Sequence, residues 1–238
     1  MPGGGRTTTA GAGAGGLHGG EDLGSNDVTP GDAVLDALWL KTLQRICERA
    51  AHEMKGALNA VAVNLEVVRS RAARPDAPAT ALARYAEAAT GQLESLIAMT
   101  GALLSLARAG GVPVDVGAEA ARVVALLGPV ARAVGRRVEE DASVRDAGTT
   151  SASAAATRLA IGGCVLAAMQ ASSDVRCVAD PGESGPGLRV EARDSGALDL
   201  DADMVGALSA AGIAVRRKEG AESSAICISF PSMTEGTN

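Results

Sequence analysis

Two long segments of the chain repeat apolar residues at alternating steps of three and four, the spacing of one face of an α-helix. In the first, expected over residues 32–74, these are Leu35, Trp39, Leu43, Ile46, Ala50, Met54, Ala57, Val61, Leu65 and Val68. In the second, expected over residues 80–109, they are Leu82, Ala86, Ala89, Leu93, Leu96, Thr100, Leu103 and Ala107. Pro75 and Pro78 separate the two segments, because proline lacks the amide hydrogen that a helix interior needs. The pattern predicts an antiparallel helical hairpin.

A hairpin of two such helices leaves apolar surface exposed to water. Two hairpins from two chains can cover that surface by packing into a four-helix bundle. The sequence therefore predicts a homodimer formed through residues 35–107.

The rest of the chain divides by composition and pattern. Residues 1–31 are rich in glycine and poor in bulky apolar side chains, which predicts a disordered tail, and residues 233–238 are expected to form a second tail. The hairpin domain is expected over 32–111 and a second domain over 112–232. In the second domain we expect helices at 117–134 and 156–171, strands at 136–141, 188–194, 213–217 and 225–230, and a linker at 142–155. The predicted fold class is α+β, a hairpin forming a dimeric four-helix bundle followed by an α/β sandwich.

Composition and charge exclude several classes of partner. The net charge of −6 and the 1% of aromatic residues argue against nucleic acid as a partner. The longest apolar runs are far shorter than the roughly 20 residues of a membrane span, and no secretory signal is evident, so we expect a cytoplasmic protein without a membrane partner. Four cysteines lack the short spacings of zinc or dithiol sites and are expected to be small buried hydrophobes, and we expect no metal or other cofactor.

One histidine is expected on the solvent face of the first helix. At about 100° per residue, His52 lies about 200° from Ala50, the centre of the apolar stripe. The residues predicted to share its face are Lys41, Arg45, Glu48, Arg49, Lys55, Gly56 and Asn59. Neutral imidazole is a nucleophile near pH 7, and nearby cations stabilise the charge of a transferring phosphoryl group, so the setting suits a phosphoryl carrier. The alternative is that His52 is an ordinary solvated surface residue.

Residues 52–59 read His-Glu-Met-Lys-Gly-Ala-Leu-Asn. They resemble the phosphoacceptor box of sensor histidine kinases, in which His-Glu-hydrophobe-Lys is followed by Asn-Pro-Leu-Asn. The resemblance extends over residues 35–230, strongly at the first helix and weakly afterwards. It implies that His52 accepts the phosphoryl group, that Glu53 orients or deprotonates the imidazole, and that Lys55 and Asn59 support the neighbouring surface. Gly56 departs from the family pattern and removes the side chain that the family uses to position water for dephosphorylation.

The same resemblance makes the second domain similar to the ATP-binding domain of these kinases, with losses. Ala167 stands where the family's Mg²⁺-binding asparagine is expected, and Gly163 stands at the other asparagine-like position. The metal would lose a ligand. The resemblance therefore implies a degenerate domain that does not use ATP, since metal and phosphate contacts supply the main electrostatic stabilisation of phosphoryl transfer.

The adenine-binding turn and the phosphate lid of the family are also incomplete. Asp194 and Gly196 match the turn, although Asp-Ser-Gly is equally an ordinary turn after a strand. Leu198 replaces a second glycine that would allow close backbone approach. Residues 202–212 offer only isolated glycines in place of a glycine-rich lid.

The sequence predicts a histidine phosphotransferase of a two-component phosphorelay, which passes a phosphoryl group between His52 and aspartates of response-regulator receiver domains. ATP-dependent kinase activity is not expected. Two alternatives remain open: a non-catalytic dimeric scaffold or pseudokinase, and a divergent active histidine kinase.

The partner's docking surface is expected beside His52. Val63 lies about 20° and Val67 about 60° around the helix from His52, so two apolar side chains share the polar face. With Arg45, Arg49 and Gly56 they form the predicted partner-binding surface. The alternative is that Val63 packs against the second domain.

Overall fold

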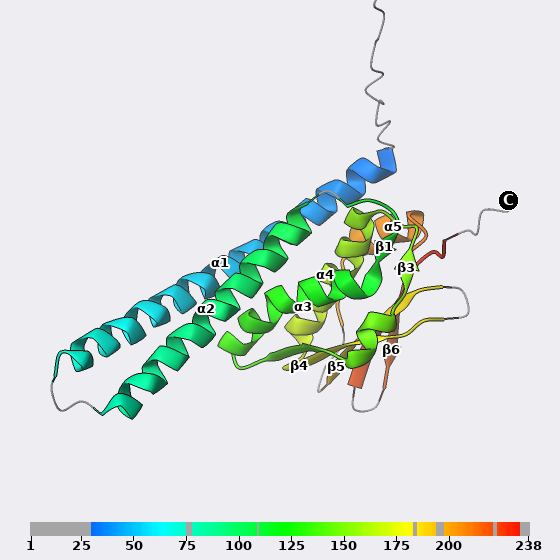
Figure 1. Cartoon of the computed structure of the whole chain (residues 1–238). Coiled ribbons are helices and arrows are strands. Elements are labelled where there is room, and N and C mark those ends of the chain that lie inside the picture. Colours follow the sequence, from blue (N-terminus) through cyan, green and yellow to red (C-terminus); the bar gives the residue numbers. More distant parts are fainter. Residues whose placement is uncertain are drawn as a thin grey trace, which may run out of the picture.

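The computed structural model of the chain describes residues 30–74, 78–108, 110–182, 185–193, 198–220 and 223–233. Helices α1 (Pro30–Ala72) and α2 (Ala79–Ala107) form the expected antiparallel hairpin, drawn in blue to green in Figure 1. Each helix begins and ends within two residues of its expected bounds. The two expected tails lie outside the described residues except at residues 30, 31 and 233, and α1 already includes 30 and 31.

The second half of the chain is a sheet covered by helices, so the protein is α+β. Along the chain it contains β1 (Val114–Asp115), α3 (Val116–Ala133), β2 (Arg137–Glu140), the 3-10 helix η1 (Ala142–Asp146), β3 (Thr149–Thr150), α4 (Ala154–Ala171), β4 (Asp174–Ala179), β5 (Gly187–Arg193), α5 (Ala202–Ala210), β6 (Ala214–Glu219) and β7 (Ser223–Ser229). Five strands pair in the order β2-β4-β5-β7-β6, with β2 parallel to β4 and the other neighbours antiparallel. Strands β1 and β3 pair separately.

Three parts of this half differ from the sequence prediction. Residues 142–155 are not a linker, because they contain η1, β3 and the first turn of α4. The side chain of Asp141 accepts a hydrogen bond from the amide of Ser143 and so begins η1. Strand β4 and helix α5 were not predicted at all, and α5 begins where the side chain of Asp201 accepts hydrogen bonds from two backbone amides.

The elements stack as sheet, helices and hairpin, and α4 lies in the middle of this stack (Figure 1). Alternate residues of the central strands, such as Val175, Val190 and Ile226, are buried beneath the helices. Of the 18 residues of α4, 14 are buried, because α1 covers one side and the sheet the other. Helix α4 is long and apolar enough to cross a membrane, but 78% of it is buried inside the protein, where it forms the centre of the core.

The hairpin and the second domain share one continuous core, which changes the expected packing of both helices. Trp39 and Ile46 of α1 are buried against α4, where a side chain at Gly162 would meet both. On α2 the buried residues are Ala89, Leu96, Met99, Ala102 and Leu106. Within one chain, four residues of the predicted α2 stripe are exposed, namely Ala86, Leu93, Thr100 and Ala107, as Leu65 is on α1.

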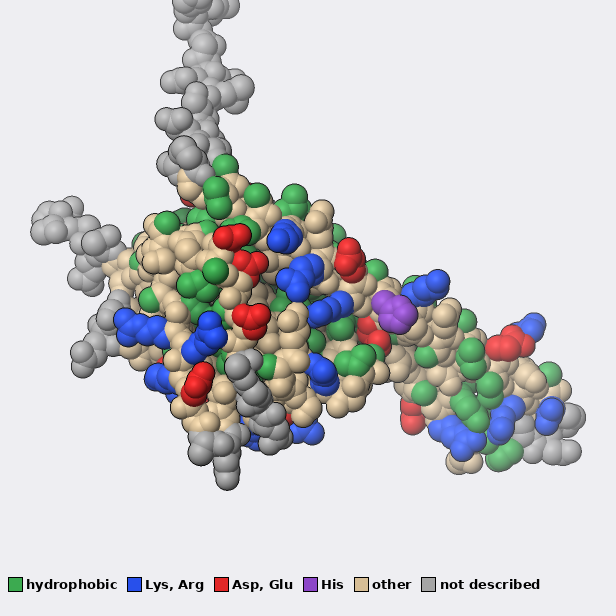
Figure 2. Space-filling view, turned by 180° about the vertical axis from the view of Figure 1, so that it is seen from behind, with side chains coloured by type: hydrophobic (Ala, Val, Ile, Leu, Met, Phe, Trp, Pro, Cys, Tyr) green, Lys and Arg blue, Asp and Glu red, His purple; other side chains and the backbone are tan. Residues whose placement is uncertain are grey.

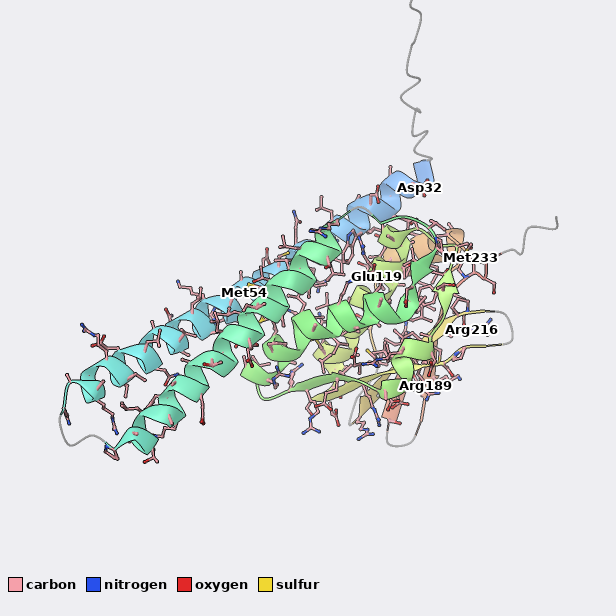
Figure 3. The ribbon with its side chains drawn as sticks, in the orientation of Figure 1. Asp32, Met54, Glu119, Arg189, Arg216 and Met233 are labelled. Atoms are coloured by element: carbon pink, nitrogen blue, oxygen red, sulfur yellow. The ribbon has the colours of Figure 1, made fainter. Side chains whose placement is uncertain are left out.

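A buried arginine of the second domain binds both a carboxylate of that domain and the end of the hairpin. The guanidinium of Arg158 on α4 binds both carboxylate oxygens of Glu119 on α3 at 3.1 Å, and the two side chains are only 7% and 5% exposed. A further nitrogen of Arg158 donates to the carbonyls of Leu106 and Arg108 at the end of α2, at 3.2 and 2.6 Å. One side chain therefore connects α2, α3 and α4, and Figure 3 shows Glu119 beneath the hairpin.

The four cysteines are free thiols, as expected. Cys164, Cys177 and Cys227 are buried, and Cys47 is half-buried. Burial raises the pKa of Cys164 and of Cys177 to about 12, so both thiols stay protonated and unreactive near neutral pH.

We predict that Arg158→Met lowers the free energy of unfolding by about 3 kcal/mol, because the buried Glu119 carboxylate then keeps only its ion pair with Arg122, whose side chain is 39% exposed. Urea unfolding followed by circular dichroism measures the change. Arg69→Met is the matched control, since Arg69 pairs with Glu66 in solvent and its loss should leave the unfolding midpoint nearly unchanged. The double variant with Glu119→Leu should be more stable than Arg158→Met alone, and equal midpoints for Arg158→Met and wild type would contradict the assigned role.

Candidate functional site

His52 lies near the middle of α1, and its side chain is exposed. The preceding stripe residue Ala50 is fully buried, so the imidazole is on the opposite side of the helix from the core. In Figure 2 the purple side chain of His52 lies where the hairpin emerges from the bulk of the protein, with basic side chains on either side.

The other predicted site residues of α1 divide by exposure. Exposed side chains belong to Arg45, Lys55, Asn59 and Val63, whereas those of Glu53, Arg49 and Val67 are half-buried. Val63 is 63% exposed, which excludes its packing against the second domain. Gly56 is exposed too, and a Cβ atom built on it would meet nothing within 4 Å.

His52 lines a cavity of about 600 Å³ between α1 and the second domain. We name this cavity the histidine pocket. On the side of α1 it is lined by Glu48, Arg49, His52 and Glu53. On the other side it is lined by residues from the end of α3, the following turn and the end of α4, which we name the sandwich wall: Val130, Ala133, Val134, Arg136, Met169 and Gln170. None of the residues of the sandwich wall was predicted from the sequence to belong to the site.

The turn between α3 and β2 sets the position of Arg136. Gly135 has a φ of +71°, which glycine adopts at little cost, and the amide of Arg136 donates to the carbonyl of Ala131 at 2.8 Å. The Arg136 side chain then donates to the carbonyl of Met169 at the end of α4. This hydrogen bond holds the guanidinium at the pocket. In the sequence, the only sign of this turn is Gly135, a glycine just after the end of a predicted helix.

The two positions at which the sequence resemblance would expect asparagines lie on α4. Gly163 and Ala167 line a second cavity of about 290 Å³, together with Lys41, Thr42 and Arg45 of α1. This volume is at the lower limit for a small-molecule site. A Cβ atom at Gly163 would lie 2.3 Å from the sulfur of Met204, so an asparagine there would have to displace that side chain. Lys41 and Arg45 therefore line this second cavity, whereas Arg49 lines the histidine pocket.

The positions that resemble the adenine-binding turn are described only in part. Asp194 and Gly196 lie outside the described residues. Leu198 is buried in the core. Within the described ranges, no three His, Cys, Asp or Glu side chains are grouped as a metal site would need.

Comparison with known proteins gives matches to solved structures alone. No family model and no curated protein matches the chain. A bacterial phosphotransferase is 14% identical, with a TM-score of 0.43 over 79% of this chain and 96% of that one. The histidine kinase AdeS of Acinetobacter baumannii is 11% identical, with a TM-score of 0.41 over 77% of this chain and 98% of that one. Full-length ShkA in complex with AMPPNP is 17% identical, with a TM-score of 0.38 over 79% of this chain and 45% of that one.

We predict that Mg²⁺ and ATP leave the melting temperature of the protein unchanged. ATP that bound the folded protein and was present at 100 times its Kd would stabilise the fold by about 2.7 kcal/mol and raise the melting temperature by several degrees. Differential scanning fluorimetry over an ATP series makes the measurement, with magnesium sulfate alone as the control. A rise that follows the ATP concentration would overturn the prediction.

Proposed function

We propose that this chain is a histidine phosphotransferase of two-component signalling, which exchanges a phosphoryl group between His52 and an aspartate of a receiver domain. The observation that carries the proposal is the exposed imidazole of His52, within a segment that resembles a phosphoacceptor box, at the rim of the histidine pocket. A phosphoryl donor can approach this imidazole from solvent without any change in the fold.

In the proposed reaction the lone pair of a neutral His52 ring nitrogen attacks the phosphorus of an aspartyl phosphate. The bond between phosphorus and the aspartate oxygen breaks, and the carboxylate leaves with the electron pair. The new nitrogen–phosphorus bond makes the ring cationic, and the proton on its other nitrogen can then pass to a base or to water. The reverse sequence returns the phosphoryl group to an aspartate, so the protein works as a carrier in either direction.

Each neighbouring residue has a proposed role. Glu53 is adjacent to His52 and accepts or holds the imidazole proton, while Lys55 and Asn59 support the surface next to the phosphoryl group. Arg45, Arg49, Gly56, Val63 and Val67 form the partner-binding surface along α1. We further propose that residues 32–111 carry the phosphoryl group and that residues 112–232 form a domain similar to the kinase ATPase but without ATP use, in a cytoplasmic protein.

The proposed active form is a homodimer. Eight large apolar side chains of the hairpin stay exposed although the second domain covers part of both helices. Besides Val34, Leu40 and Val63 they are Leu58, Leu65, Leu93, Ile97 and Leu104, which form the proposed dimer surface. Leu58 lies about 120° and Leu65 about 140° around α1 from His52. A second hairpin can therefore pack on these residues while both histidines stay accessible.

We predict that His52→Gln abolishes phosphoryl acceptance and leaves the helical content unchanged, because the side chain is exposed. The assay incubates the protein with receiver domains from response regulators of the same organism, each labelled with radioactive phosphate, and follows acid-labile label on the chain. His18→Gln is the matched control, since His18 and His52 are the two histidines of the sequence, and this variant should accept label normally.

The same assay separates the alternatives. Label taken directly from ATP would identify an active kinase, and label taken from neither ATP nor any receiver would identify a scaffold. Acceptance by the His52→Gln variant would contradict the assignment of the carrier residue.

We predict that Ile97→Asp converts the dimer into a monomer, because a carboxylate would have to be buried in the bundle. Sedimentation velocity at micromolar concentration measures the mass. Val63→Asp is the matched control, since Val63 is 63% and Ile97 65% exposed but Val63 lies on the histidine face. A wild-type monomer, or an Ile97→Asp dimer, would exclude this interface.

A further inference from the structure

We infer that the sandwich wall is half of the surface on which the receiver domain docks, so that the second domain serves partner recognition rather than nucleotide chemistry. The inference rests on the proposed function. It assigns partner-binding roles to Val134 and Arg136, which lie more than 80 residues beyond His52 in the sequence and line the same pocket.

The first argument is the apolar character of the sandwich wall. Val130 and Met169 are buried and form its floor, while Ala133 and Val134 are exposed at its rim. Val134 is 67% exposed, the highest value among the large apolar residues exposed in the described part of the chain. An exposed valine continuous with a buried apolar floor offers burial to an apolar side chain of a partner.

The second argument is the charge at the corner between α3 and β2. Three arginines and two carboxylates line an adjacent cavity of about 700 Å³: Arg132, Arg136, Arg137, Glu139 and Asp174. Arg136 lines both this cavity and the histidine pocket. Arg137 is 3.6 Å from the carboxylate of Glu139. The side chain of Arg136 donates to a neutral carbonyl and makes no ion pair within the described part of the chain. On the opposite side of the pocket, α1 contributes the carboxylates of Glu48 and Glu53 and the guanidinium of Arg49. The sandwich wall therefore carries one arginine and no carboxylate, whereas the carboxylates outnumber the arginine on the α1 side, and it suits an acidic side chain of a partner.

The third argument is size. A domain of about 100 residues has a radius of gyration of roughly 13 Å. Its diameter therefore exceeds the distance along α1 from His52 to Val63, which is approximately 16 Å. The sandwich wall begins at the pocket that His52 itself lines. A receiver whose aspartate reaches His52 from this side must therefore contact the sandwich wall. The shared core and the Arg158 contacts hold that wall in a fixed position relative to α1.

The test uses two charge changes on the sandwich wall in the full chain. Val134→Glu places a carboxylate on the apolar rim, and Arg136→Glu reverses the charge at the basic corner. Val34→Glu is the control for the first change, since Val34 is also an exposed valine, 52% exposed, near the other end of α1 from the hairpin turn. Arg216→Glu is the control for the second, because Arg216 is an exposed arginine on the sheet, far from Met54 beside the histidine (Figure 3).

Phosphoryl transfer is measured from a labelled receiver domain over a concentration series, beside the circular dichroism spectrum and sedimentation mass of each variant. We expect each sandwich-wall variant to raise the half-saturating receiver concentration about tenfold, with the rate at saturation within twofold of wild type. The two controls should behave as wild type. Added salt should weaken receiver binding less in Arg136→Glu than in wild type, since the attraction between charges is screened.

The outcomes distinguish the two proposals. Normal transfer kinetics in folded, dimeric Val134→Glu and Arg136→Glu proteins would overturn the docking surface and leave the proposed function intact. A wild-type protein that accepts label from no receiver would overturn the proposed function and, with it, the docking surface. A loss of rate at saturation with an unchanged half-saturating concentration would also contradict a docking role, because it would indicate an effect on the transfer step.

Discussion

The arrangement of this protein depends on the buried interaction between Arg158 and Glu119. The end of a helix leaves carbonyl groups without partners, and such groups are costly to bury. Here the end of α2 lies against the second domain, and Arg158 donates to the carbonyls of Leu106 and Arg108 while it binds Glu119 through its other nitrogens. Only a planar guanidinium offers donors in enough directions for both tasks, so lysine could not replace it. The interaction fixes the angle at which the chain leaves the hairpin, and the position of α3 beside α2 follows from it.

That angle gives α1 two different environments along its length. Its first part, including Trp39, Ile46 and Ala50, is a partner of α4 in the core, and its last part extends beyond the second domain (Figure 1). His52 lies at the change between the two. The same packing places Lys41, Thr42 and Arg45 over Gly163 and Ala167, where the resemblance to kinases would expect a nucleotide. The packing of α1 against the second domain thus produces both the histidine pocket and the covered cavity.

The sequence predicted the hairpin well because apolar spacing reports directly on helices, and both helices end within two residues of the expected positions. It predicted the faces of α2 less well. Apolar residues on that helix serve three purposes, contact with α1, contact with α3 and exposed surface, and a single stripe cannot separate Met99 and Leu106 from Leu93. Strand β4 alternates as Asp-Val-Arg-Cys and was missed although it is six residues long. The linker prediction at 142–155 overlooked the capping residue Asp141. His52 was identified as a candidate from a local motif, residues 52–59. The sandwich wall could not be predicted, because its residues meet α1 only through tertiary packing.

The absence of a side chain at Gly56 affects what a carrier at His52 could do. A Cβ atom there would have open space around it, so the glycine is not required by packing. A longer polar side chain at this position could hold a water molecule beside the phosphoryl group and promote hydrolysis, as the family is expected to do. With glycine the position supplies no such group, and water near the imidazole remains unoriented. Since orientation contributes much of the rate of a bimolecular step, hydrolysis of the phosphoryl group would be slow relative to its transfer to a docked aspartate. On the proposed function, Gly56 therefore favours a chain that conserves the phosphoryl group over one that removes it.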